Sequence, residues 1–277
     1  LACRLLSYAK RFKEIRIVKK NQEKKMKKLM KLVLSALIAV SLATSVHAQD
    51  NDKTSFSVAF NTDAFFGFNV LAGAGIPLSD SLSLDFYGLF WTTNGFTTGN
   101  TATGGGGGAP WTEFGGGVTL TPVEALSVSL YVGVLSGNLQ SQNGRATLGE
   151  AIVPNLTVAY NDGMFEANVY AGFYKTMFAG ADHRGTVNDF LHYWTSAGYV
   201  INKNFSVGVH WEQLINTAYP TGSTSAGTWN TNYSWIGPYL SVNLPDNNAS
   251  LSFAGGLDVL GPTTQEHFYK MSIGLNF

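Results

Sequence analysis

Apolar and polar residues alternate with a period of two over much of the chain. From Leu126 to Val134 every second residue is apolar, and serine, tyrosine or glycine stands between. Similar alternation runs through 165–173, 251–259 and 269–277. Successive side chains of a β-strand point to opposite faces, so this pattern predicts strands with one apolar face. A convincing helical period is absent after residue 48, and the sequence therefore predicts an all-β protein.

Twelve strands are expected from this pattern and from the turn residues between its segments. The expected bounds are 54–62, 64–78, 81–93, 111–122, 125–136, 150–160, 164–176, 189–201, 204–216, 232–244, 249–260 and 267–277. The first two strands are the least distinct, because one parity of apolar residues continues from Phe56 to Leu78. If 54–60 only extends the next strand, the count falls to ten.

The connections between these strands alternate between short and long. Short turns are expected at 79–80, 122–124, 161–163, 202–204 and 245–248, and longer links at about 94–110, 137–149, 177–188 and 217–230. Aromatic residues stand beside the short turns, namely Tyr160, Phe165, Tyr199 and Phe205. Outer-membrane barrels combine short periplasmic turns, long external loops and aromatic girdles. The sequence thus predicts a transmembrane antiparallel up-and-down β-barrel.

The last nine residues alternate and finish on an aromatic ring. They resemble the C-terminal assembly signal of bacterial outer-membrane proteins, with Tyr269, Gly274, Leu275 and Phe277 in the matching positions. The resemblance implies insertion by the barrel-assembly machinery and contact with outer-membrane lipid and lipopolysaccharide. The segment 61–68 also resembles the start of an uncharacterised family of small, porin-like bacterial barrels, which implies the fold and no activity.

A basic and then apolar segment precedes the barrel. From Met26 a lysine-rich stretch leads into an apolar run at 32–42, which closes with Val46-His47-Ala48. Small residues at positions −3 and −1 are typical of a signal peptide, and the run is shorter than the ~20 residues of a membrane-spanning helix. We therefore expect cleavage after Ala48. We interpret 1–25 as an upstream extension that is not translated, 26–48 as the signal peptide and 49–277 as the barrel.

The balance of basic and acidic residues differs between the leader and the barrel. Residues 1–48 contain 12 of the 18 lysines and arginines and two of the 18 acids, which leaves 6 basic and 16 acidic residues in 49–277. Phosphate binding needs clustered lysine and arginine, so no nucleic-acid partner is expected. The one cysteine, Cys3, lies in the extension, so we expect neither disulfides nor thiolate chemistry in the barrel.

Polar residues of the inward parity are candidates to line a pore. They are Asp85, Glu113, Glu166, Asn168, His192, His210, Glu212, Asp258 and Lys270. Unpaired carboxylates are costly in a dry interior, so the five acids favour a hydrated lumen that attracts cations. The alternative is a closed interior in which the acids pair locally.

Aromatic residues of the same parity lie near the long links. The expected aromatic mouth consists of Trp91, Trp194, Trp235, Tyr87, Tyr170, Tyr174 and Tyr239. Such rings could stack on sugars or nucleobases, whereas an interfacial belt is the simpler interpretation. A one-residue error in register would reverse the inward placement.

Motifs for catalysis, metals or cofactors are weak. The run Gly104–Gly108 lacks the helix and lysine of a phosphate-binding loop, and the histidines lack metal-ligand spacing. His210 and Glu212 share a face, but the His-x-x-Ser-Asn-Gly pattern of an outer-membrane phospholipase is absent. We expect no metal, cofactor or enzymatic activity.

These observations predict a narrow, passive pore of the outer membrane for small hydrophilic solutes, with a bias to cations or neutral molecules. A non-conducting barrel with interaction loops is the first alternative, and an outer-membrane enzyme is the second. The sequence predicts no oligomeric state.

Overall fold

The computed structural model describes residues 54–91, 111–137, 147–177, 189–218, 229–244, 248–260 and 266–277. The predicted extension, signal peptide and most of the long links lie outside these residues. Within the described ranges, no helix has the length and apolar character needed to cross a membrane.

The predicted all-β fold and its twelve strands are confirmed. The strands are β1 (Ser55–Asp63), β2 (Gly67–Ser79), β3 (Leu82–Trp91), β4 (Trp111–Val123), β5 (Leu126–Gly137), β6 (Thr147–Asn161), β7 (Phe165–Thr176), β8 (Asp189–Asn202), β9 (Phe205–Ala218), β10 (Asn230–Leu244), β11 (Ala249–Asp258) and β12 (His267–Asn276). β1 and β2 are separate strands, so the alternative count of ten is wrong.

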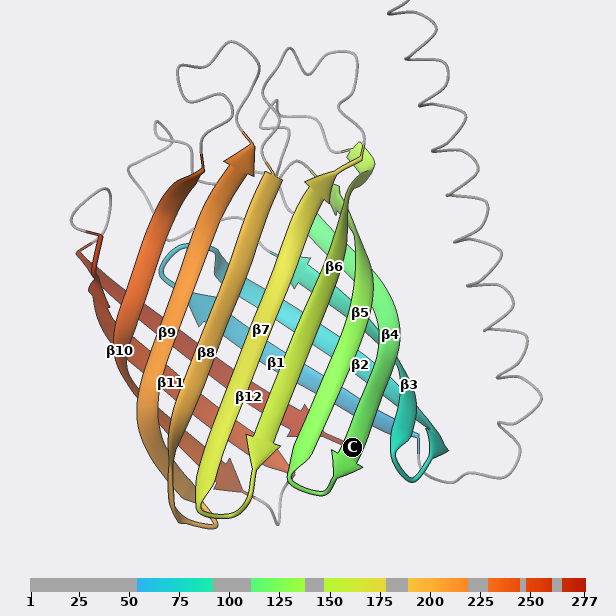
Figure 1. Ribbon diagram of the computed structural model, residues 1–277, viewed down its shortest axis with the longest axis vertical. Helices are drawn as coiled ribbons and strands as arrows, with labels where there is room; N and C mark the ends of the chain where they lie inside the picture. The colour runs from blue at the N-terminus through green and yellow to red at the C-terminus, as the bar shows by residue number, and fades with distance from the viewer. Residues whose placement is uncertain are drawn as a thin grey trace, which may run out of the picture. The chain divides into compact units, whose positions relative to one another are not determined.

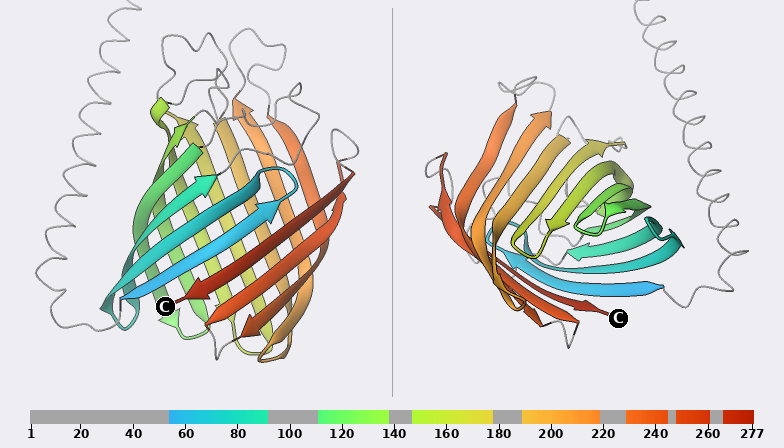
Figure 2. Two further views of the ribbon diagram at one scale, coloured as in Figure 1. Left: turned by 180° about the vertical axis from the view of Figure 1, so that it is seen from behind. Right: turned by 60° about the horizontal axis from the view of Figure 1, so that its bottom comes forward.

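The strands form one closed antiparallel barrel in which each strand pairs with its sequence neighbours (Figure 1). Closure comes from β1 and β12, for example through the pairs Val58–Leu275 and Asn61–Ser272. A closed barrel satisfies the backbone hydrogen bonds of every strand, which the apolar core of a membrane requires. Figure 2 shows β1, β2, β11 and β12 side by side in the wall opposite β5–β9.

The two ends of the barrel differ in their connections. We call the end with the short connections β2–β3, β4–β5, β6–β7, β8–β9 and β10–β11 the turn end, and the opposite end the loop end. The β1–β2 connection is the exception, because it lies at the loop end yet contains only Ala64, Phe65 and Phe66.

Burial follows the predicted parity. On β5 the side chains of Leu130, Val132 and Val134 are exposed, whereas Ser129 and Leu135 are buried. The predicted girdle residues Tyr160, Phe165, Tyr199 and Phe205 are likewise exposed on the outside of the barrel. An apolar outer band of this extent is stable against lipid and unfavourable against water.

Candidate functional site

The β1–β2 turn is held in shape by Asp63. One carboxylate oxygen of Asp63 accepts the backbone N–H of Phe65 at 2.8 Å and of Phe66 at 2.5 Å. Gly67 follows with φ of 74°, a conformation that glycine adopts without steric cost. The short Asp-Ala-Phe-Phe-Gly sequence thus forms a tight turn that presents two adjacent phenylalanine rings.

These two rings reach strands far from β1 and β2 around the barrel. The ring of Phe65 lies 5.0 Å from that of Tyr233 on β10. The ring of Phe66 lies 5.7 Å from that of His192 on β8 and 6.5 Å from that of Trp111 on β4. β1 and β2 pair only with each other, β12 and β3, so these contacts cross the interior. The tip of the hairpin therefore folds into the barrel.

Two buried apolar clusters pack around the tip in the interior. One contains Ala64, Leu214, Tyr233, Trp235, Tyr239, Ala254 and Phe268. The other contains Trp111, Leu135, Ala151, Val153 and Tyr174. Phe66 and Phe190 pack against both clusters, which join into one plug across the barrel.

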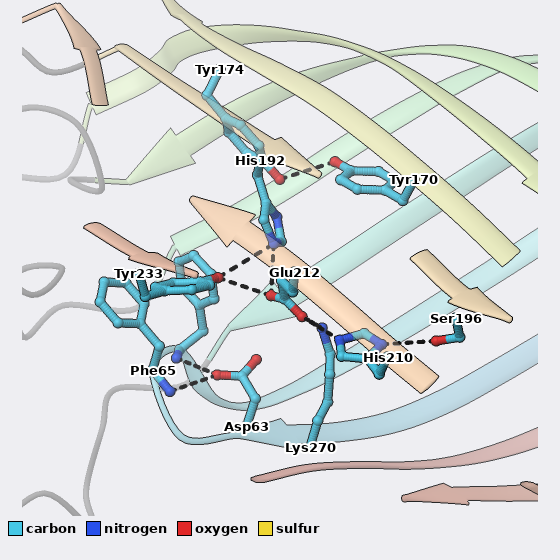
Figure 3. Close-up of polar contacts among 11 residues, drawn as sticks. Asp63, Phe65, Tyr170, Tyr174, His192, Ser196, His210, Glu212, Tyr233 and Lys270 are labelled. Carbon is cyan, nitrogen blue, oxygen red and sulfur yellow. Dashed lines mark hydrogen bonds and ion pairs between the residues drawn. The ribbon is translucent and has the colours of Figure 1, made fainter. Parts of the chain in front are cut away.

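A polar cluster centred on Glu212 lies beside this plug (Figure 3). Glu212 is fully buried, and one of its oxygens accepts hydrogen bonds from Tyr233 at 2.9 Å and contacts His192 Nε2 at 2.8 Å. The other oxygen contacts His210 Nε2 at 3.0 Å and pairs with the ammonium group of Lys270. A buried carboxylate is tolerated only with this degree of pairing. Because Glu212 is on β9 and Lys270 on β12, the ion pair bridges the interior.

The other predicted acids also have local partners. Asp85 accepts hydrogen bonds from Ser83, Thr119 and Tyr131. Local pairing, the alternative given above, is therefore present for the polar interior.

Glu113, Glu166 and Asp258 complete this set of paired acids. Glu113 accepts from Tyr87, and Glu166 accepts from Ser206 and Tyr239. Asp258 accepts the backbone N–H of Ser234 at 3.1 Å. The side-chain partners of Glu113 and Glu166 are neutral hydroxyls.

Cavities remain inside the barrel between the described residues. The first, of about 560 Å³, extends from turn-end residues such as Glu124 and Asn161 to Trp194, His210 and Lys270 in the middle of the barrel. Much of its lining is small and polar, namely Ser127, Ser196, Ser241, Ser250, Ser252 and Ser272 with Asn168 and Asn243.

The second cavity, of about 500 Å³, lies against β1–β3 and is lined by more aromatic side chains. Asn61, Trp194 and Lys270 border both cavities. Asp85 and Glu113 also line the second cavity, whereas Glu166, Asn168 and His210 line the first.

The predicted aromatic residues occupy different environments. Trp235 is 1% exposed, and its ring is stacked between Tyr233 at 4.0 Å and Phe268 at 5.0 Å. Trp194 borders both cavities and lies 6.0 Å from the ring of Tyr170. Both faces of Trp235 are thus covered by protein rings, whereas Trp194 meets open space.

Several residues of this interior were not singled out from the sequence. They are Asp63, Phe65, Phe66, Trp111, Ser196 and Tyr233. The signal for Ser196 was its shared parity with Trp194, and the signal for Trp111 its shared parity with Glu113. The inward fold of the tip had no equivalent signal, because it depends on contacts across the barrel. In the described part of the chain, no group of three or more His, Cys, Asp or Glu side chains is arranged to hold a metal ion.

A closed barrel with an apolar outer band and a polar, cavity-containing interior defines a class, the porin-like β-barrels of bacterial outer membranes. Within this class, the chain belongs to the Family of unknown function (DUF6733), which it matches over residues 26–277.

Comparisons with other proteins add distant likenesses. No curated protein matches the chain. It is similar to a NanC porin structure at 7% identity, with 79% of this chain and 98% of that chain covered and a TM-score of 0.46. It is similar to LpxR from Salmonella typhimurium at 8% identity, with 80% of this chain and 99% of that chain covered and a TM-score of 0.45. It is also similar to the COG4313 outer membrane channel from Pseudomonas putida F1 at 10% identity, with 81% of this chain and 95% of that chain covered and a TM-score of 0.46. At these scores the likenesses carry no inference about function.

Proposed function

We propose that the protein is a passive outer-membrane channel for small hydrophilic solutes, closed in this conformation by the β1–β2 tip. The observation that carries the proposal is the serine- and asparagine-lined cavity of about 560 Å³, which runs from the turn end to Lys270. A dry structural barrel has no need of such a space, and polar walls of this kind favour water and hydroxylated solutes over apolar ones.

The closure consists of two kinds of contact. Phe65 and Phe66 occupy the interior between β10 and β4, and the Glu212–Lys270 ion pair bridges the barrel beside them. Lys270 stands directly opposite Asp63 in the β1–β12 ladder. A move of the ammonium group from Glu212 to Asp63 would exchange one carboxylate partner for another and release the bridge.

The charge of the interior favours cations and neutral molecules over anions. Asp85 and Glu166 line the cavities and accept hydrogen bonds from neutral hydroxyls. Carboxylates that keep their charge in a low-dielectric channel attract counter-ions and repel anions. Replacement of Glu166 with Gln should therefore reduce the preference for potassium over chloride.

Single-channel recording of the purified protein in a planar bilayer tests the proposal. Phe66→Ala removes a ring from the plug and should raise the open time or conductance. Phe68→Ala is the matched control, because Phe68 is on the same hairpin with a 38% exposed side chain and stacks on Phe60 at 6.5 Å. Folded, inserted protein that passes no current in either variant would favour the non-conducting barrel instead.

We also propose that the chain is translated from Met26, cleaved after Ala48 and inserted by the barrel-assembly machinery. The amino-acid pattern of 26–48 and the resemblance of 269–277 to an assembly signal support this route. N-terminal peptide mass spectrometry of the outer-membrane protein should find Gln49 as the first residue. Peptides from 1–25 would contradict the proposed start.

A further inference from the structure

Three polar side chains in the middle of the barrel form a continuous chain of hydrogen bonds. Ser196 on β8 and His210 on β9 are directly opposite each other in the ladder. Ser196 Oγ lies 2.8 Å from His210 Nδ1, and His210 Nε2 lies 3.0 Å from Glu212 Oε2. The order hydroxyl, imidazole, carboxylate is visible in Figure 3.

This order determines the role of each imidazole nitrogen. An ionised carboxylate only accepts hydrogen bonds, so Glu212 orients the Nε2–H of His210 towards itself. The Nδ1 lone pair then faces the hydroxyl of Ser196 and can take its proton. The Lys270 ammonium pairs with the same Glu212 oxygen.

The hydroxyl group of Ser196 also lines a cavity. Ser196, His210 and Asn168 all line the cavity of about 560 Å³. Asn168 on β7 is the residue directly opposite Ser196 on the side away from His210. A row of amide, hydroxyl and imidazole thus crosses three neighbouring strands and faces the same cavity, and a side-chain amide is a suitable donor to a developing oxyanion.

We propose that Ser196 is the nucleophile of a hydrolytic site for carboxylic esters of small hydrophilic molecules. His210 is the general base and acid, Asn168 the oxyanion donor and Glu212 a positioning residue. The polar lining and the size of the cavity restrict the substrate to a small ester without a long acyl chain. This activity goes beyond the proposed channel and does not depend on it.

The reaction balances with water as the only co-substrate. The Ser196 oxygen attacks the ester carbonyl as its proton passes to His210 Nδ1, and the carbonyl oxygen receives the Asn168 amide hydrogen bond. Collapse of the tetrahedral intermediate breaks the ester C–O bond, and the leaving alcohol takes the proton from His210. A water molecule, deprotonated by His210, then attacks the acyl-Ser196 ester. This second step releases the carboxylic acid and returns the proton to Ser196.

A fluorophosphonate probe and p-nitrophenyl acetate test the site on the full protein purified in detergent. Peptide mass spectrometry should place the phosphonate on Ser196. Ser196→Ala should abolish labelling and lower ester hydrolysis by about 100-fold or more, the scale of general-base catalysis. Ser81→Ala is the matched control, because Ser81 is exposed at the β2–β3 turn and lines neither cavity. Its labelling and hydrolysis should stay within about twofold of the unmodified chain.

Heat-modifiable migration on gels shows which variants are folded, and Ser196→Cys offers a second variant with a nucleophile at the same place. The cysteine form should react with iodoacetamide faster than Ser252→Cys, because His210 promotes the thiolate. Folded protein without labelling at Ser196, or hydrolysis unchanged in Ser196→Ala, would overturn the inference. Conductance measured on the same preparations reports on the channel separately, so either proposal can fail alone.

Discussion

The two halves of the barrel interior are built by the same strands but contain different side chains. On β10 the inward position near the loop end is Trp235, whereas nearer the turn end it is Ser241. On β12 the corresponding residues are Phe268 and Ser272. Rings pack the loop half at β10 and β12, and the turn half contains a cavity of about 560 Å³. Strand number sets the width of the barrel, but the volume of the inward side chains decides whether a given level is filled.

Removal of a ring from the packed half should have the largest effect on stability. Trp235→Ala deletes an indole that is 1% exposed and stacked on both faces. The expected loss is about 3–5 kcal/mol in the free energy of unfolding. Urea unfolding of the folded protein in detergent micelles measures it. Trp229→Ala, at a 68% exposed residue, should change the value by less than about 0.5 kcal/mol. Equal losses in the two variants would contradict the packed loop half.

Loss of a single hydroxyl in the packed half should cost less. Tyr233→Phe keeps the ring against Phe65 but removes the hydrogen bond of 2.9 Å to the buried Glu212 carboxylate. Hydrogen bonds to charged groups contribute about 1.5–3 kcal/mol, and this is the expected decrease in the same unfolding experiment. Tyr199→Phe is the control, because that side chain is 51% exposed on the outside of the barrel. A neutral result for Tyr233→Phe would mean that Glu212 is satisfied by its other partners.

The difference between the halves shows which features of the protein could be predicted from the sequence alone. Alternation predicted the parity correctly, because a period of two is a local property of each strand: Leu130 and Val132 face out and Ser129 faces in. The short turns also followed from local residue types. These local signals were enough for the barrel and the outer girdle, and they left the strand count at twelve or ten.

The interior contacts depend on register and closure, which are not local. His210 and Glu212 shared a face in the sequence, but Ser196 joins them only through the β8–β9 register. Phe65 and Phe66 meet β10 and β4 only because the barrel is closed and the tip turns inward. A pattern of single residues contains no information about which distant side chains meet across a lumen. The pairing of the acids was therefore left open between two alternatives.

A substitution in the turn half should change the volume of the cavity more than the stability of the protein. Ser241→Val adds an apolar side chain to the wall of the turn-half cavity. We expect the free energy of unfolding to change by less than about 0.5 kcal/mol, as at other loosely packed positions. Differential scanning calorimetry of the wild-type and variant proteins checks this expected change. A loss comparable to that of Trp235→Ala would show that the turn half is as tightly packed as the loop half.

The smallest effect is expected outside both halves, at the β6–β7 turn. Asp162 accepts the backbone N–H of Phe165 at 2.7 Å and of Met164 at 2.9 Å, and these hydrogen bonds lower the pKa of its carboxyl from the ordinary value of 3.8. A lowered folded-state pKa stabilises the protein above the unfolded-state pKa, and this contribution is lost as the pH falls through the folded-state value.

Asp162→Asn should therefore lower the urea midpoint slightly at pH 7, and the difference from the wild type should shrink as the pH falls below about 3.8. Midpoints measured across this range test the sign. Asp80→Asn, at the β2–β3 turn, measures the general effect of removing a turn carboxylate. A difference that grows as the pH falls would contradict the role of Asp162, because a protonated carboxyl is a poorer acceptor for the two N–H groups.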